Sequence, residues 1–140
     1  MHKVLNRSRI GFVVAMWVAL AGAASASDIK VTLSGNQEVP AVATTASGSA
    51  RFKVKDDLSI SGSVKTTGIK AVAAHIHEGA AGANGAVAIP LTAKGDNEWI
   101  VPAGAKLTAA QMDALKAGNL YVNVHSDAHK GGEIRAQLKQ

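Results

Sequence analysis

The sequence predicts an all-β domain, an antiparallel β-sandwich of seven or eight short strands with one short helix. Short runs that alternate apolar and polar residues recur along the chain, as in residues 49–55, where Ala50, Phe52 and Val54 share one face. Turn signals separate these runs about every ten residues, a spacing typical of sandwiches. A single segment carries the start and stop signals of a helix.

The strands follow one another with short connections. Pro40 favours an edge strand or a loop for the second run, because proline cannot donate to a ladder. Asp56 and Asp57 form a turn between two runs that pair as a hairpin. Residues 79–85 form a glycine–alanine loop that can approach a ligand closely. The extended runs are 29–33, 37–42, 49–55, 58–64, 69–78, 86–91, 98–102, 120–125 and 133–138.

The helix is predicted between Thr108 and Gly118. Thr108 and Gln111 fit a capping box, and Gly118 fits the glycine that ends many helices. Met112 and Leu115 would face the core. We interpret Met112 as core filler and not as a copper ligand, since buried methionines usually fill irregular gaps.

The first residues have the order of a secretory signal peptide. Three basic residues precede an apolar run at 10–20, and small residues lead to Ala26. The apolar run is shorter than the about 20 residues that span a membrane. We therefore expect a signal peptide over residues 1–26, a domain over residues 27–140, a periplasmic or secreted location and no membrane span after cleavage. An uncleaved anchor is the alternative.

Composition limits the function classes. The chain has 15 lysines and arginines against 10 acidic residues, and three of the basic residues lie in the predicted leader. The remaining domain would carry a charge of about +2, with its lysines scattered as a solvated surface, so nucleic-acid binding is not expected. The chain has no cysteine. Disulfides, thiolate ligands and thiol nucleophiles are thus excluded, and the fold depends on packing or on a metal.

Four histidines are the candidate metal ligands. In the strand A-A-H-I-H-E-G, His75 and His77 share one face about 6–7 Å apart, close enough to bind one ion. His125 ends a second strand, and His129 follows it in a turn. If the two strands are neighbours, three rings converge and His129 could supply a fourth. Neutral imidazoles without thiolates suit Cu(II) or Zn(II).

Polar neighbours could support this site. The second strand would point Leu120, Val122 and Val124 inward and Tyr121, Asn123 and His125 outward. Glu133 or Asp127 could orient a ring or complete the ligand shell. Alternatively, the histidines are surface residues that form hydrogen bonds with their polar neighbours. The supporting candidates are Asn123, Asp127, Glu133 and Arg135.

Five motifs resemble the CHRD domain, a module of chordin and of many exported bacterial proteins. The motifs are L-S-G-N-Q-E-V-P at 33–40, A-A-H-I-H-E-G-A at 73–80, L-T-A-A-Q-M-D-A-L-K-A-G at 107–118, N-L-Y-V-N-V-H-S at 119–126 and G-G-E-I-R-A-Q-L at 131–138. The resemblance implies an immunoglobulin-like antiparallel β-sandwich of the Greek-key type. Chordin is an extracellular antagonist of growth factors, so the resemblance also implies a protein-interaction module.

The function expected from these patterns is a non-enzymatic, exported binding protein with a histidine site for copper or zinc. An interaction module without metal is the first alternative. The H-x-H-E-G run is also similar to the copper strand of Cu,Zn superoxide dismutase, which makes a dismutase-like enzyme the second. Against it, no cysteine is present for that family's disulfide, and four histidines cannot fill both of its metal sites. No hydrolase elbow or phosphate loop is found.

Overall fold

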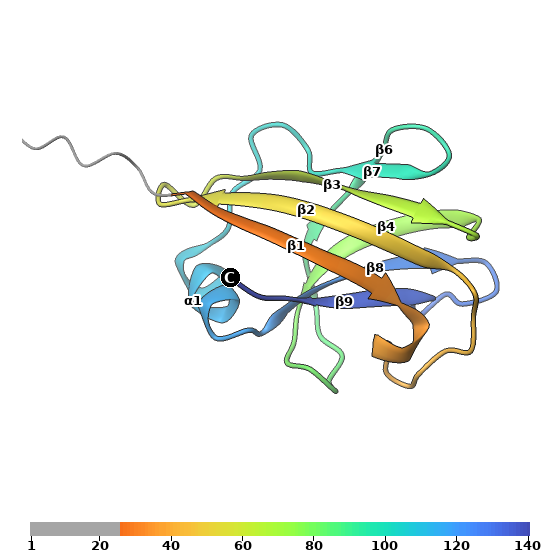
Figure 1. Ribbon diagram of the computed structural model, residues 1–140. Helices are drawn as coiled ribbons and strands as arrows, with labels where there is room; N and C mark the ends of the chain where they lie inside the picture. The colour runs from red at the N-terminus through yellow and green to blue at the C-terminus, as the bar shows by residue number, and fades with distance from the viewer. Residues whose placement is uncertain (1–25) are drawn as a thin grey trace, which may run out of the picture.

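The structure is a computed structural model that describes residues 26–140, and the predicted signal peptide lies outside this range apart from its last residue. Nine antiparallel strands, one α-helix and one short 3₁₀ helix (η1) make up the described chain (Figure 1). The elements are β1 Ala26–Ser34, η1 Gly35–Gln37, β2 Ser47–Lys55, β3 Ile60–Thr67, β4 Ala71–Glu78, β5 Val87–Pro90, β6 Thr92–Ala93, β7 Glu98–Ile100, α1 Ala109–Lys116, β8 Leu120–Ser126 and β9 Ile134–Leu138. The all-β prediction is confirmed.

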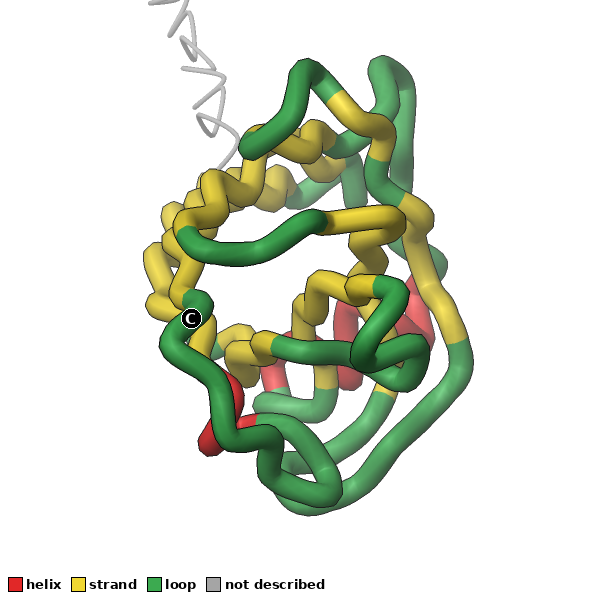
Figure 2. The backbone as a smooth tube through the Cα atoms, turned by 90° about the vertical axis from the view of Figure 1, so that its right-hand side faces the viewer, coloured by secondary structure: helices red, strands yellow, loops and turns green. Residues whose placement is uncertain are grey.

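The strands form two layers joined along one edge. Hydrogen bonding gives the order β5-β4-β8-β9-β1-β2-β3-β7-β6, and the only β1–β9 partners in register are Ser34 and Arg135. One layer holds β1, β2 and β3 with β6 and β7, and the other holds β4, β5, β8 and β9 (Figure 1). Seen along the strands, the chain curves around a closed outline (Figure 2). Nine strands exceed the predicted seven or eight because the two-residue β6 is too short to show a pattern.

The expected extended run at 37–42 is not a strand. Gly35 to Gln37 form the 3₁₀ helix instead, and the chain then turns back on itself. The carbonyl of Gly35 accepts hydrogen bonds from the amides of Glu38 (3.1 Å) and Val42 (2.9 Å). A Cβ at Gly35 would collide with the carbonyl of Val42, so glycine permits this close approach. Residues 35–42 thus form a compact turn after β1 and not a strand.

The core lies between the two layers. In β2 the alternation is strict, with Ala50, Phe52 and Val54 buried and their neighbours exposed. β8 directs Leu120, Val122 and Val124 into the same core, as the sequence predicts. Burial of these apolar side chains is the main stabilising term for a domain without disulfides.

The helix follows its predicted signals. The side chain of Thr108 accepts a hydrogen bond from the Gln111 amide (3.1 Å), and the Gln111 side chain accepts one from the Thr108 amide (2.9 Å). Gly118 has a φ of 77°, which ends the helix. Met112 and Leu115 are buried in the core, consistent with a packing role for the methionine. No helix within residues 26–140 is both long and apolar enough to cross a bilayer.

Candidate metal centre

Pairing of β4 with β8 brings three histidines together. The two strands are antiparallel, with Ala73 opposite His125 and His75 opposite Asn123. His125 is therefore the diagonal neighbour of His75 on the face turned away from the core, where long side chains can meet. The ring centroids of His75 and His125 are 4.8 Å apart, and those of His75 and His77 are 5.4 Å apart. The predicted convergence of three imidazoles is present.

Backbone carbonyls fix the tautomers of two of these rings. Nδ1 of His77 lies 3.0 Å from the carbonyl oxygen of Gly85, and Nδ1 of His125 lies 2.8 Å from that of Lys130. Because a carbonyl oxygen can only accept, both Nδ1 atoms carry the hydrogen and donate it. The Nε2 atom of each neutral ring is then left with a free lone pair. A backbone carbonyl on the distal nitrogen is the usual arrangement for a histidine that binds a metal.

The free nitrogens point to a common space. One ligand atom from each of His75, His77 and His125 lies within 4.8 Å of the others. Nδ1 of His75 is 3.0 Å from Nε2 of His125, and in the absence of an ion it donates to that lone pair. Nε2 of His77 is buried and has no hydrogen-bond partner among the described residues. A buried nitrogen without a partner is costly, and an ion bound between the rings would satisfy it.

The environment keeps two of the rings neutral. Burial lowers the pKa of His75, and the nearby His125 and His77 lower it further. Burial also lowers the pKa of His77, although its hydrogen bond to Gly85 opposes this shift. The sign follows from desolvation, which disfavours the charged imidazolium. Neutral rings at pH 7 need not lose a proton before they bind a metal.

The polar face of β8 is covered, contrary to the exposure that an outward direction suggests. Tyr121, Asn123 and His125 do point away from the apolar core, yet they are only 2%, 2% and 9% exposed. The loop that contains Gly85 and the turn that contains Lys130 lie over this face and form hydrogen bonds with it. Alternation identifies the face of a residue but not what covers it, so burial could not be read from the strand.

His129 is not brought into the cluster. Its Nε2 lies 3.7 Å from a carboxylate oxygen of Glu133, and its amide donates to the Ser126 hydroxyl at 3.2 Å. The same oxygen of Glu133 accepts a hydrogen bond from the Thr44 hydroxyl at 3.3 Å. Asp127 is exposed in the same turn. These predicted supporting residues lie beside the site but contact none of its three rings.

Arg135 fastens the loop that covers the site. It is 1% exposed, and its guanidinium carbon lies 3.4 Å from the centre of the Tyr121 ring. It donates hydrogen bonds to the Asn84 side chain at 3.3 Å, to the Ala80 carbonyl at 3.1 Å and to the Gln137 side chain at 3.2 Å. A buried guanidinium needs such partners. Arg135 therefore links β9 to the loop between β4 and β5.

Tyr121 connects Arg135 to the histidines. On its other side the ring stacks on His77, with centroids 4.8 Å apart and an angle of 1° between the planes. The Tyr121 hydroxyl accepts a hydrogen bond from the Gly85 amide at 3.1 Å, and the Gly85 carbonyl accepts from His77. The orientation of His77 is thus fixed by its stacking partner and by its loop. Of the predicted supporting residues, Arg135 acts through this chain of contacts.

Glu38 is the functional candidate that the sequence did not reveal. It is 6% exposed, and one of its carboxyl oxygens has no hydrogen-bond partner within the described chain. Burial raises the pKa of Glu38 from 4.5 to about 7, while Arg135 and then Asn123 act in the opposite direction. The Asn123 amide lies beside Glu38 and His77 without a well-formed hydrogen bond to either. In the sequence, Glu38 stood out only as a member of the motif at 33–40, in a run without strand periodicity.

The raised pKa of Glu38 predicts a pH-dependent stability. The unfolded chain releases this proton near pH 4.5 and the folded chain near pH 7, so stability is present at low pH and is lost as the pH rises through that window. Relative to the wild type, Glu38→Gln should gain about 2 kcal/mol in the free energy of unfolding between pH 5 and pH 8. The histidines contribute equally to both proteins and cancel.

Urea denaturation of both proteins at several pH values measures this difference. Glu98→Gln, which removes one carboxylate from β7 on the other layer, is the control for the change in charge. A constant difference between Glu38→Gln and the wild type across pH 5 to 8 would contradict a buried, protonated Glu38.

Gly85 is predicted to be intolerant of any side chain. A Cβ at this position would overlap the carbonyl of Glu78 and lie 3.4 Å from the Cα of Gly79. Gly85→Ala should therefore lower the free energy of unfolding by roughly 2–4 kcal/mol, since backbone atoms would have to move. Gly131→Ala is the control, because a Cβ there meets open space. Thermal melting followed by circular dichroism would measure both, and equal effects would argue against this close packing.

Comparison with known proteins agrees with the family resemblance of the five sequence motifs. The family model described as the CHRD domain matches residues 29–138, which covers all three clustered histidines, Glu38 and Arg135. No curated protein and no solved structure gives a significant match to the chain.

Proposed function

Because this chain belongs to the CHRD domain family, we propose that it is an exported, non-enzymatic binding protein whose three clustered histidines hold one Cu(II) or Zn(II) ion. Family membership supports an extracellular protein-interaction module, and the histidine cluster adds the ligand. Periplasmic or secreted placement is part of this proposal. His75, His77 and His125 would be the ligands, and Arg135 and Tyr121 would hold them in position.

One observation carries the proposal. His77 and His125 donate their Nδ1 hydrogens to backbone carbonyls, so each Nε2 carries a lone pair, and Nε2 of His125 lies 3.0 Å from Nδ1 of His75. The unpartnered Nε2 of His77 is the specific cost that an ion would remove.

The distances suit a transition metal. Nitrogens bound to one ion at about 2.0–2.1 Å stand about 3–4 Å from one another. Nδ1 of His75 and Nε2 of His125 are already 3.0 Å apart, and the largest separation within the cluster is 4.8 Å. Ring movements of about 1 Å would therefore complete a three-nitrogen site. An all-imidazole set favours Cu(II) over Zn(II) in affinity, because copper leads the divalent series.

The non-enzymatic part of the proposal rests on the surroundings of the site. Ser126 follows His125 in the sequence, but its hydroxyl accepts a hydrogen bond from the His129 amide. The ring of His125 is directed to the Lys130 carbonyl and not to this hydroxyl. A nucleophile needs a base within hydrogen-bond reach. Within residues 26–140 the hydroxyl of Ser126 has the His129 amide as its partner and no such base, which supports a binding role.

Metal titration tests this function. Protein without a histidine tag, stripped with a chelator, is titrated with Cu(II) and with Zn(II) in competition with a chromogenic chelator at pH 7.5. We expect one equivalent to bind and, at a free metal concentration about 100 times Kd, the melting temperature to rise by about 10 °C. Absence of stoichiometric binding together with an unchanged melting temperature would overturn the metal assignment.

A metal-free interaction module is the second candidate, and family membership supports it. It predicts that capture of a protein partner on immobilised domain is the same for metal-loaded protein and for protein kept in chelator. The metal proposal predicts that the exposed edge around His75, which is the least buried of the three rings, changes its accessibility when the ion binds. Hydrogen exchange of the backbone amides of β4 and β8, measured with and without metal, separates the two candidate functions, because only the metal proposal predicts a difference.

A further inference from the structure

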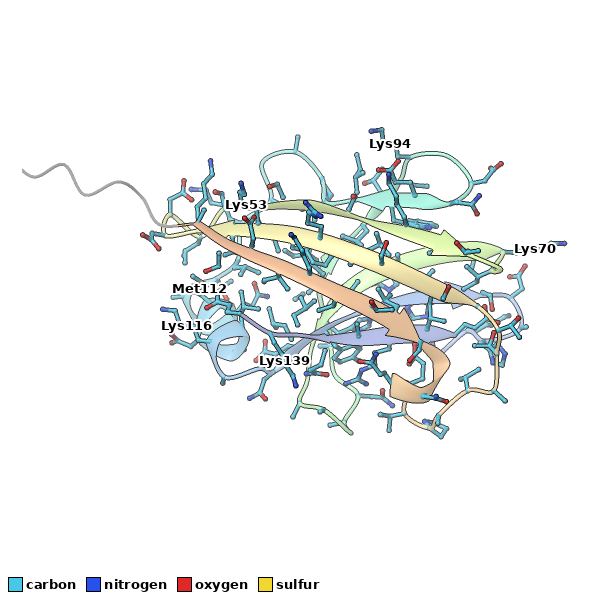
Figure 3. All side chains as sticks on the ribbon, viewed as in Figure 1. Lys53, Lys70, Lys94, Met112, Lys116 and Lys139 are labelled. Atoms are coloured by element: carbon cyan, nitrogen blue, oxygen red, sulfur yellow. The ribbon has the colours of Figure 1, made fainter. Side chains whose placement is uncertain are left out.

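The outer face of β1, β2 and β3 gathers basic residues that are far apart in the sequence. The sequence suggested scattered lysines without a cluster, and the structure corrects this. Side chains alternate along a strand, so every second residue of these three strands faces solvent. Lys53 stands on this outer side of the layer in Figure 3. The exposed basic residues of the face are Lys30, Arg51, Lys53, Lys55 and Lys65.

The face carries shallow depressions. Two adjoining depressions of about 570 and 420 Å³ share Arg51 and Ser63 in their linings. The larger one is also lined by Lys30 and Lys65 and by two hydroxyl residues, Thr32 and Ser49. We call this surface the basic groove. It alternates positive charges with hydroxyl groups and lies on the layer opposite to the three histidines.

Within the described residues, Lys53 of the basic groove has an acidic partner and three other basic side chains of the groove have none. Lys30 lies directly opposite Arg51 in the β1–β2 register, and like charges in that position destabilise a sheet. Asp28 reaches Lys53 at 3.7 Å. Glu98 is opposite Lys65 in the register, but no ion pair within 4 Å joins them. Within residues 26–140, Lys30, Arg51 and Lys65 therefore form no salt bridge, and an external anion would relieve their repulsion.

We propose that the basic groove binds a linear acidic polysaccharide. The basic side chains of the groove can pair with carboxylate or sulfate groups along the polysaccharide. Thr32, Ser49 and Ser63 can form hydrogen bonds with sugar hydroxyls. A flat anionic membrane fits a hollowed surface less well and would favour apolar side chains for insertion. Single-stranded nucleic acid would favour aromatic stacking platforms, and the aromatic residue of β2, Phe52, is buried in the core.

Binding to size-defined oligosaccharides tests the proposal. Fluorescence titration of the full domain with a heparin dodecasaccharide and with a polyuronate of similar length should give saturable binding that weakens with salt. Lys30→Ala/Arg51→Ala/Lys65→Ala should weaken it at least tenfold, since three charge contacts are lost. The control Lys94→Ala/Lys116→Ala/Lys139→Ala removes the same charge from exposed positions elsewhere (Figure 3) and should change Kd by less than about twofold.

Several outcomes would overturn the proposal. Equal losses in the two triple variants would mean that net charge alone attracts the ligand. Tighter binding to single-stranded DNA or to phosphatidylglycerol vesicles would assign the groove to another partner. The His75→Ala/His77→Ala variant should bind the oligosaccharides like the wild type, so failure of the metal proposal leaves this one testable. Both triple variants replace exposed side chains, and their melting curves confirm folding before titration.

Discussion

His75→Ala/His77→Ala is expected to weaken Cu(II) binding by a factor on the order of 10³ or more. The double variant leaves His125 as the single member of the cluster, and one imidazole cannot hold a divalent ion against water and buffer. Competition with a chromogenic chelator at pH 7.5 measures the change. His129→Ala is the matched control, because His129 lies outside the cluster beside Glu133. The Kd of this variant for Cu(II) should stay within about twofold of the wild-type value.

A folding effect must be separated from the loss of ligands. His77 stacks on Tyr121, so its removal disturbs a buried contact. His75 is only partly buried and its side chain contacts the other two histidines. His75→Ala alone should therefore keep the fold and still lose at least about 30-fold in affinity. Retention of wild-type affinity in this single variant, or an equal loss in His129→Ala, would rule out the three-histidine site.

Arg135→Leu is expected to lower the free energy of unfolding by about 3–5 kcal/mol. The substitution removes a buried charge that lowers the pKa of Glu38, and it leaves the Asn84 side chain and the Ala80 carbonyl without their hydrogen-bond donor. The cation–π contact with Tyr121 is lost as well. Because Tyr121 and its loop hold His77, metal affinity should also fall about tenfold. Urea denaturation measures the first effect and chelator competition measures the second.

Arg51→Leu is the control for this prediction. Arg51 is the other arginine of the described chain, and it is exposed on β2. Its substitution should change stability by no more than about 0.5 kcal/mol. If the two arginine variants destabilised the protein equally, or if Arg135→Leu were as stable as the wild type, the network around Arg135 would not be holding the loop.

Strand alternation predicted the faces on which the three histidines lie, and their convergence was predicted on the condition that the two strands are neighbours. His75 and His77 share a face in any β-strand, and His125 lies on the polar face of its own strand. Antiparallel pairing of neighbouring strands then brings the two polar faces together. The faces followed from local periodicity, whereas the pairing of β4 with β8 is supplied by the structure. The capping box at Thr108 was also predictable from local sequence, since both of its partners lie within one turn.

Properties that depend on distant segments were not predictable in this way. Glu38 is buried because the turn around Gly35 folds it toward Arg135, which lies nearly one hundred positions later in the chain. The burial of Asn123 depends on loops whose glycine-rich sequences have no periodicity. The basic groove requires the register that sets Lys30 against Arg51. His129 was placed near the cluster by sequence proximity, but its turn directs it to Glu133.

β8 is buried at all seven positions, because the core covers one of its faces and the loops cover the other. β2, with nine residues, is buried only at every second position. A saturation mutational scan scored by folded yield should therefore show tolerance with a period of two along β2 and no tolerant position along β8. The strand that carries His125 cannot accumulate neutral changes on either face. Adaptation of this protein to a different ligand would then have to proceed through β4 and the covering loops, while β8 stays constant.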